Sequence, residues 1–165
     1  MNRPVREKVG IAACRVGRAP LLLEAPGLGS CLGIALYDPA TQVGGLAHSL
    51  LPASVADVEG EPAGKYVEGA IRAMVDEMTS LGADRQRLWA RIAGGANMFA
   101  SLSGSSDERV GARNARQARQ TLQSLGIPLL GEDVGGHYGR TLEFNLATGQ
   151  VRVRTVRGPR TAYLL

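Results

Sequence analysis

The sequence is poor in cysteine, histidine and aromatic residues, and these scarcities exclude several classes of protein. Aromatic residues make up 4% of the 165 residues, whereas proteins that bind single-stranded nucleic acid stack bases on aromatic side chains in a basic groove. The excess of 19 basic over 15 acidic residues is mild and lies largely in "ERVGARNARQARQ" and "VRVRTVRGPR". We interpret these arginines as solvated surface residues and expect no nucleic-acid partner.

Long apolar runs are also missing. No segment approaches the roughly 20 apolar residues that cross a bilayer. The charged start "MNRPVREKVG" lacks the apolar core of a secretory signal. The chain length suits one hydrophobic core, so we expect a single domain over residues 1–165 that resides in the cytoplasm and does not insert into a membrane.

The two cysteines, Cys14 and Cys31, are expected to be reduced thiols, with a disulfide as the minor alternative. A zinc site can be written from both cysteines with His48 and His137. That set lacks the close cysteine pair and the close histidine pair of zinc modules. We therefore expect no metal, and we expect Cys14 to be a small buried apolar residue.

Apolar and alternating runs, punctuated by glycine and proline, predict most of the secondary structure. The strands are expected within residues 8–16, 20–25, 30–38, 43–52, 88–99, 127–134, 140–145 and 150–156. A helix with one buried face is predicted over 64–81 and ends at Gly82. A second helix is predicted over 107–125, with Ser105 and Glu108 spaced as a capping box. This order favours an α+β fold, with helices covering a mixed or antiparallel sheet.

The segment "GLGSCLGIALYDPATQVGGLAHSLLP" places Cys31 and His48 on two strands joined by the turn "DPATQ". In an antiparallel hairpin, paired residue numbers add to a constant, and side chains alternate between faces. A register in which paired numbers add to 81 puts Cys31 and His48 on one face, one diagonal step apart. The thiol and the imidazole are then expected to meet.

Chemistry and composition leave two interpretations of this pair open. The small-residue face of Cys31, Gly33 and Ala35 is expected to leave room for a substrate. Backbone amides of Gly27 to Ser30 are expected to form an anion-stabilising nest. A thiol beside an imidazole base suits acyl transfer from an amide or ester. The alternative is that Cys31 and His48 are ordinary buried residues, because free cysteine is among the most buried residue types.

Six motifs in order narrow this choice: "GLGSCLGIALYDP", "GGLAHSLLP", "KYVEGAIRAMVDEM", "GGANMF", "VGARNAR" and "EDVGGHYGRTLEFNLATGQVRV". Together they resemble the bacterial chemoreceptor glutamine deamidase family CheD over nearly the whole chain. The resemblance implies packed β-sheets with two outer helices, similar to the cysteine hydrolases found in deamidating bacterial toxins.

The same resemblance implies a cytoplasmic amidohydrolase of chemotaxis that converts chemoreceptor glutamines to glutamate, and in some members hydrolyses receptor methyl esters. Cys31 matches the nucleophile, and His48 matches the general base and acid. No metal or organic cofactor is implied. The implied partners are chemoreceptor cytoplasmic domains and a CheC-type phosphatase.

The sequence departs from the family six residues before Cys31. Members generally carry a threonine there that orients the histidine, whereas this chain has Ala25, whose methyl group cannot hydrogen-bond an imidazole. Three explanations follow: another group such as Ser30, Glu24 or Asn97 orients His48, the pair works without an orienter, or the chain is a catalytically impaired signalling adaptor. Ala112 also replaces an acidic residue of the family.

Other residues support weaker hypotheses. Asn97 and His137 lie in glycine-rich motifs and are candidates to contact a substrate amide, although turn chemistry is the simpler explanation of the glycine pairs. Arg109, Arg113 and Arg116 fall near one face of the second helix. An acidic partner can be imagined there, but a solvated face is the commoner meaning.

Overall fold

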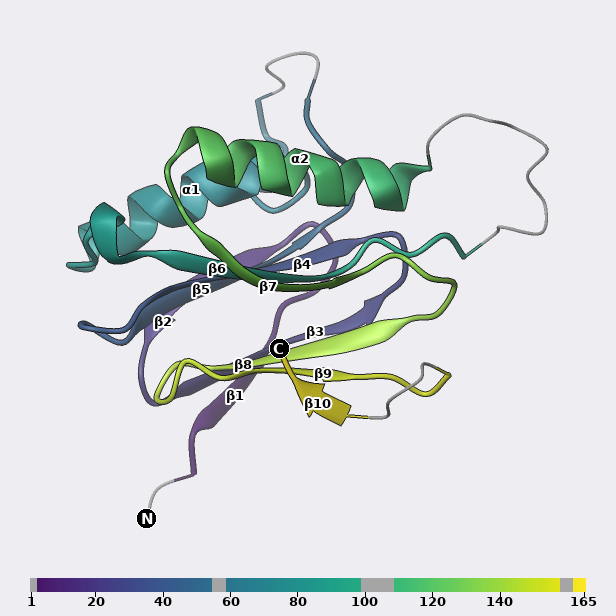
Figure 1. Cartoon of the computed structure of the whole chain (residues 1–165). Helices are drawn as coiled ribbons and strands as arrows, with labels where there is room; N and C mark the ends of the chain where they lie inside the picture. Colours follow the sequence, from purple (N-terminus) through teal and green to yellow (C-terminus); the bar gives the residue numbers. More distant parts are fainter. Residues whose placement is uncertain (1–2, 55–58, 99–108, 158–161) are drawn as a thin grey trace.

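Two β-sheets and one layer of helices are stacked in the computed structural model, which describes residues 3–54, 59–98, 109–157 and 162–165 (Figure 1). The first sheet has the strand order β1-β3-β8-β9-β10, and the second has β2-β5-β4-β6-β7. Helices α1 and α2 cover the outer face of the second sheet, and the first sheet covers its other face. The elements are β1 (Val5–Lys8), β2 (Cys14–Arg18), β3 (Leu21–Leu28), β4 (Leu32–Asp38), β5 (Val43–Ser49), α1 (Val67–Ser80), the 3-10 turn η1 (Arg85–Arg87), β6 (Trp89–Gly94), α2 (Val110–Ser124), β7 (Leu129–Val134), β8 (Arg140–Asn145), β9 (Val151–Arg154) and β10 (Ala162–Leu164).

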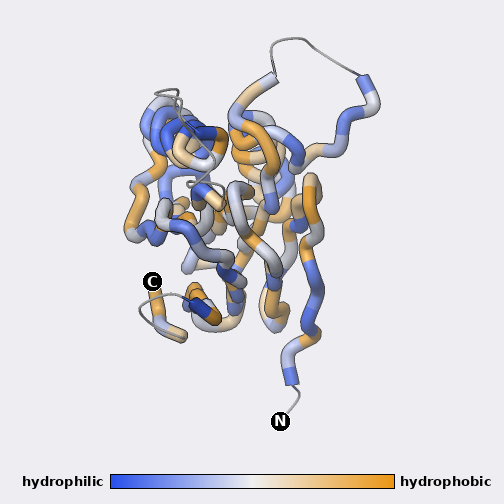
Figure 2. The backbone as a smooth tube through the Cα atoms, turned by 90° about the vertical axis from the view of Figure 1, so that its right-hand side faces the viewer, coloured by the Kyte–Doolittle hydropathy of each residue, from blue (hydrophilic) through white to orange (hydrophobic). Residues whose placement is uncertain are grey.

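The predicted α+β class with mixed sheets and two outer helices is confirmed. Each sheet joins antiparallel pairs to one parallel pair, which is β1 with β3 in the first sheet and β6 with β7 in the second. One apolar core fills the space between the second sheet and the helices, and another fills the space between the sheets. Figure 2 shows apolar stretches of the strands gathered inside, with hydrophilic residues along the helices' outer sides.

Helix α1 has the single buried face that the spacing predicts, and Gly82 ends it with φ 99°, a conformation that favours glycine. The buried set is Val67, Ala70, Ile71, Met74, Val75 and Met78. The second predicted helix is confirmed as α2. Its predicted capping box, Ser105 with Glu108, lies outside the described residues.

The predicted strand over residues 8–16 is wrong. The chain leaves β1 at Lys8 and enters β2 at Cys14, and these strands belong to different sheets. Between them the chain turns, with Ala12 at φ 68° and the Ala13 N–H donating to the Gly10 carbonyl over 3.0 Å. Alternating apolar residues imitate a strand here because Val9 is buried in the core between the sheets.

A buried carboxylate closes the turn between β4 and β5. Asp38 is fully buried and accepts hydrogen bonds from Arg87 Nε and Nη2, both at 2.9 Å, and from the backbone N–H groups of Asp84 and Ala40 at 2.9 and 3.0 Å. Burial alone would raise the pKa of Asp38, but these donors hold it well below its ordinary value of 3.8. The turn is therefore tied to η1 by a carboxylate that stays charged.

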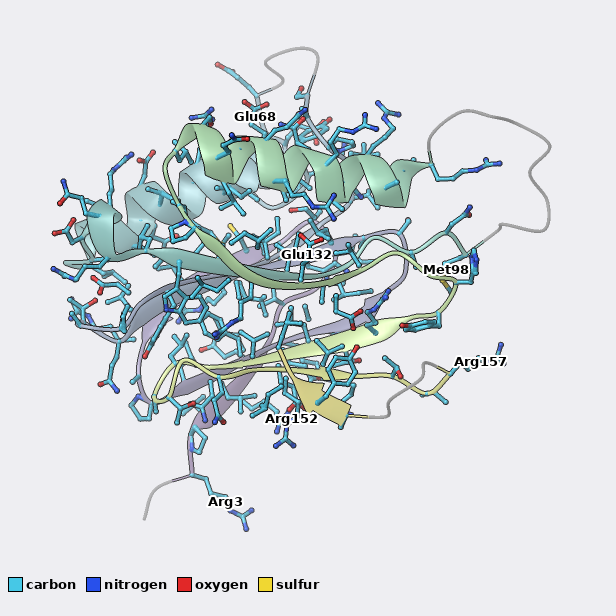
Figure 3. The ribbon with its side chains drawn as sticks, in the orientation of Figure 1. Arg3, Glu68, Met98, Glu132, Arg152 and Arg157 are labelled. Atoms are coloured by element: carbon cyan, nitrogen blue, oxygen red, sulfur yellow. The ribbon has the colours of Figure 1, made fainter. Side chains whose placement is uncertain are left out.

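Charged side chains project from both outer surfaces, for example Arg152 from the first sheet and Glu68 from α1 (Figure 3). Within the described ranges, no helix has both the length and the apolar composition to cross a lipid bilayer.

Candidate active site

Cys31 and His48 lie on the same face of the second sheet, one diagonal step apart. Strands β4 and β5 pair Leu32 with Ser49 and Gly33 with His48, so paired numbers add to 81, and the predicted register is confirmed. Cys31 stands immediately before β4, on the face shared by Gly33 and His48. The hairpin thus places both residues near its open end, but no hydrogen bond joins the thiol to the imidazole, because His48 Nε2 has no partner among the described residues.

The expected free space on this face is not there. The face packs against the first sheet, and a side chain at Gly33 would meet Leu28 Cδ1 at 3.0 Å and Leu142 Cδ1 at 3.2 Å. Cys31 itself is 7% exposed. The small residues therefore admit the neighbouring sheet and leave little of Cys31 exposed.

His48 is held by a backbone carbonyl. Its ring Nδ1 lies 3.0 Å from the Val9 carbonyl oxygen, and the side chain is buried. A carbonyl only accepts, so Nδ1 carries the hydrogen and donates it, which leaves the lone pair on Nε2 in the neutral ring. The backbone of His48 is fixed as well, because its carbonyl accepts from Ala12 N–H at 2.8 Å and its N–H donates to Ala13 at 2.9 Å.

The second ring nitrogen of His48 is left open. Nε2 is buried and has no hydrogen-bond partner among the described residues. Burial lowers the pKa of His48 below its ordinary value of 6.5, and the Val9 carbonyl only partly opposes this. The ring is therefore neutral near pH 7 and offers a basic nitrogen inside the protein.

The Cys31 thiol is neutral for the same physical reason. Burial raises the pKa of Cys31 above its ordinary value of 9.0, with a smaller opposing effect from its own backbone N–H. The pair is thus a thiol with an imidazole, and not a thiolate with an imidazolium. Such a pair makes its nucleophile during attack, by proton transfer to the base.

Glycines let a second loop approach Cys31 closely. Gly94 has φ 114°, and a Cβ there would lie 2.4 Å from the Cys31 carbonyl oxygen. Gly95 N–H donates to that carbonyl at 2.9 Å, and Ala96 N–H donates to Gly29 at 2.9 Å. These contacts fix the backbone on either side of Ser30, and the close approach with positive φ at Gly94 and Gly95 explains this glycine pair.

The three side chains proposed to replace the family threonine do not bond the His48 ring, whose Nδ1 bonds Val9 and whose Nε2 has no described partner. The Glu24 carboxylate instead pairs with Arg6 at 2.8 Å and Arg154 at 3.4 Å on the outer side of the first sheet. Sequence reasoning missed Val9 because a backbone carbonyl leaves no mark on residue type. The sequence offered only an indirect indication, which was an apolar residue directly before Gly10.

The other candidate ligands are spread apart. Cys14 pairs with Ala47 and packs toward the helices, whereas Cys31 packs between the sheets, so the two thiols stand on opposite faces of one sheet, and both are free. His137 is exposed, with Nδ1 2.9 Å from the Asn97 carbonyl. Across the described ranges, no cluster of histidine, cysteine and acidic residues could hold a metal ion.

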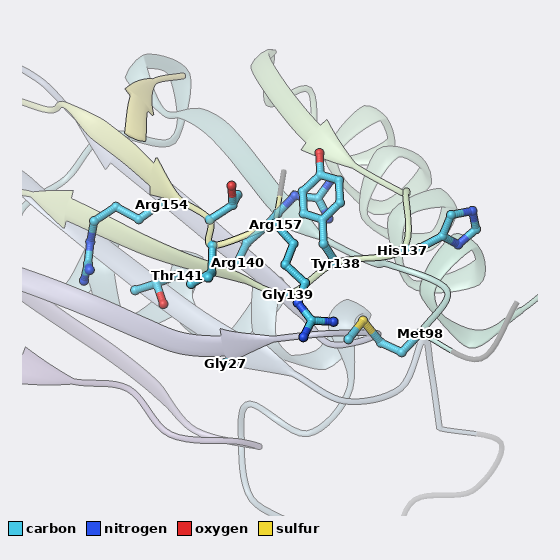
Figure 4. Close-up of a pocket in the computed structure, with 11 residues that line it drawn as sticks. Gly27, Met98, His137, Tyr138, Gly139, Arg140, Thr141, Arg154 and Arg157 are labelled. Atoms are coloured by element: carbon cyan, nitrogen blue, oxygen red, sulfur yellow. The ribbon is translucent and has the colours of Figure 1, made fainter. Parts of the chain in front are cut away.

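A groove of about 480 Å³ opens beside Gly27, near the end of β3 (Figure 4). Met98, Tyr138, Arg154 and Arg157 are among its lining residues, whereas Cys31 and His48 are not. The Met98 side chain also covers Gly29, where a Cβ would meet it at 3.2 Å. The groove is thus a neighbour of the candidate pair and separate from it.

Comparisons with known proteins agree on one family. A family model described as CheD chemotactic sensory transduction matches residues 50–155, which begin just after His48. The Probable chemoreceptor glutamine deamidase CheD 2 of Geobacter metallireducens is 49% identical over 152 residues, covering 92% of this chain and 94% of that protein. The Probable chemoreceptor glutamine deamidase CheD of Moorella thermoacetica is 49% identical over 158 residues, covering 95% of each chain.

Similarity extends to an archaeal protein and, weakly, to a solved structure. The Probable chemoreceptor glutamine deamidase CheD of Pyrococcus abyssi is 45% identical, with 92% of each chain covered. The crystal structure of the Bacillus licheniformis hypothetical protein YfiH aligns with 73% of this chain and about half, 49%, of that one, at a TM-score of 0.43 and 15% identity. That structural likeness is too distant to bear on function.

Proposed function

The chain belongs to the CheD family, and on that premise we propose that it hydrolyses chemoreceptor glutamine side chains to glutamate, with Cys31 as nucleophile and His48 as general base. As a family member it is a glutamine deamidase of chemotaxis. The observation that supports the catalytic pair is the His48 ring, whose Nδ1–H is engaged by Val9 and whose Nε2 is buried without a described partner.

Acylation begins with the neutral pair. His48 Nε2 takes the proton from Cys31 Sγ as sulfur attacks the glutamine side-chain carbonyl, which forms the carbon–sulfur bond and an oxyanion. The predicted nest at Gly27 to Ser30 is our candidate source of backbone N–H donors for that oxyanion. The protonated Nε2 then gives its proton to the departing nitrogen. Ammonia leaves and a thioester remains.

Deacylation uses the same ring in the opposite order. Nε2 removes a proton from a water molecule, and the oxygen of that water attacks the thioester carbonyl. The carbon–sulfur bond breaks, Sγ recovers a proton from Nε2, and the glutamate side chain is released. Because Val9 holds Nδ1–H throughout, each proton moves only at Nε2.

The impaired-adaptor alternative rested on Ala25, and the Val9 contact weakens it. The family threonine would orient a histidine nitrogen, but Nδ1 of His48 already has a hydrogen-bond acceptor. Nδ1 therefore has a hydrogen-bond acceptor without the missing hydroxyl.

We favour an active enzyme that resides in the cytoplasm with the receptor domains it modifies. We also propose a CheC-type phosphatase as a second partner, on family resemblance alone.

Incubation with a chemoreceptor cytoplasmic fragment, followed by peptide mass spectrometry, tests the proposal. We expect glutamine-to-glutamate conversion by the wild-type chain and by Cys14→Ala, and none by Cys31→Ala. Cys14→Ala is the matched control because it removes the other thiol, on the opposite face of the same sheet. Conversion that persists in Cys31→Ala would refute the cysteine mechanism. No conversion of a fragment that other family members modify would refute the activity.

A further inference from the structure

Asn114 is a fully buried polar residue on α2 that the proposed reaction does not use. Its side-chain Nδ2 donates to the Ser30 carbonyl at 2.9 Å and to the Leu50 carbonyl at 3.1 Å. The amide has two N–H groups on one nitrogen, and each acceptor here is a carbonyl. These two bonds fix which way the amide points.

The two carbonyls lie just beyond the paired ends of β4 and β5, next to the candidate catalytic pair. Ser30 precedes Cys31, and Leu50 lies two residues beyond His48. The β4–β5 ladder ends at Leu32 with Ser49, and one further step of the same register would bring residue 31 opposite residue 50. Asn114 therefore links the strands where their own backbone pairing has stopped.

The approach of α2 to this point depends on a glycine. A Cβ at Gly111 would lie 2.5 Å from the carbonyl oxygens of Gly95 and Ala96, so another residue there would push the helix away. Gly95 is also the residue whose N–H holds the Cys31 carbonyl. Asn114 follows Gly111 by three residues, about one helical turn, and thus reaches Ser30 and Leu50.

We propose that Asn114 is a positioning residue that fixes the segments carrying Cys31 and His48 relative to each other for proton transfer. Its effect on turnover rests on the proposed deamidase function. Small displacements of reacting groups cost about 10²-fold in rate. Loss of the two Asn114 hydrogen bonds therefore lowers kcat and leaves KM little changed, because Asn114 is buried and does not meet the substrate.

The test compares Asn114→Ala with Thr121→Ala. Thr121 lies seven residues later on α2, is also buried, and accepts a hydrogen bond from Gln117 at 3.0 Å, far from either carbonyl. We expect Asn114→Ala to lose at least ~10-fold in kcat with KM within about twofold. Thr121→Ala should lose stability and keep kcat. If the alanine variant does not fold, Asn114→Ser replaces it in the test. Its hydroxyl has one hydrogen for two carbonyls, so its kcat should also be lower than that of the wild-type chain.

Alkylation of Cys31 by iodoacetamide, in a Cys14→Ala background, separates this proposal from the activity itself. In the Cys14→Ala chain that keeps Asn114, the labelling rate should fall as acid protonates His48. In Asn114→Ala that dependence should vanish, and the rate should follow thiol ionisation alone. The positioning role is overturned if Asn114→Ala keeps both the wild-type kcat and the wild-type labelling profile, or if Thr121→Ala matches it in both. If no variant deamidates a receptor fragment, the labelling profiles still decide.

Discussion

The two ends of the β4–β5 hairpin treat buried polar groups in opposite ways. At the closed end, Asp38 is charged, and donors from Arg87 and two backbone amides satisfy it. At the open end, Cys31 and His48 are neutral, and His48 Nε2 has no partner among the described residues. The closed end stabilises the fold. The open end keeps one nitrogen available, as proton transfer requires.

The largest expected effect comes from removing the open nitrogen. In His48→Gln, the amide can still donate to Val9, but it is not a base near neutral pH. We expect deamidation to fall by about 10²- to 10⁴-fold, the usual contribution of a general base, with little change in Tm. Rate assays beside thermal melts measure both quantities. A loss of Tm that parallels the loss of rate would show that the open end is structural.

A change at the closed end should lower stability and leave the reaction rate unchanged. Asp38→Ala removes the acceptor of the buried network, and we expect unfolding free energy to fall by about 2–4 kcal/mol. Arg87 stays partly in solvent, which limits the cost. Urea denaturation measures the loss, and kcat per folded molecule should be unchanged. A lowered kcat at full folding would mean that the two ends are coupled.

Acid should separate the two ends by pH. The pKa of Asp38 is lowered in the folded state, so its stabilisation is complete above the unfolded value of 3.8 and is lost as pH falls toward the folded value. The pKa of His48 is lowered below 6.5, so the base remains neutral to lower pH than an exposed histidine. We expect kcat/KM to fall with a midpoint below 6.5 while the protein is still folded. A midpoint above 6.5 would contradict the burial of the ring.

The smallest effect is expected from restoring the family residue. Ala25→Thr places a hydroxyl in the fully buried core between the sheets, at a cost of about 1–3 kcal/mol if it finds no partner. Because Val9 already holds Nδ1, kcat should change little. A large gain in kcat would mean that the Val9 carbonyl is a poor orienter.

The side-chain pattern predicted the elements and the strand pairing that place Cys31 and His48 on one face of the hairpin. Alternation fixes which residues share a face, and the buried face of α1 follows from helical spacing alone. The passage of the chain from one sheet to the other at Val9, and the packing of the first sheet over Gly33, were not predictable in this way. Both depend on backbone groups and on contacts between residues far apart in the sequence.

The contacts of Asn114 were also not predictable from the sequence. Its motif "VGARNAR" stands out in the sequence, but only the fold reveals that its amide reaches the Ser30 and Leu50 carbonyls, just beyond the ends of two strands. The family resemblance predicts Cys31 and His48 as site residues. The structure adds what they touch, and here it shifts attention from the absent threonine at Ala25 to the carbonyl of Val9.

The central claim is that His48 is a neutral base with its hydrogen on Nδ1 and its lone pair on Nε2. Nitrogen-15 NMR of the imidazole rings tests it directly, because the chain has only two histidines and His137→Asn assigns the remaining signals to His48. At neutral pH we predict a protonated Nδ1 and an unprotonated Nε2. An imidazolium ring, or a ring protonated at Nε2 alone, would contradict the account.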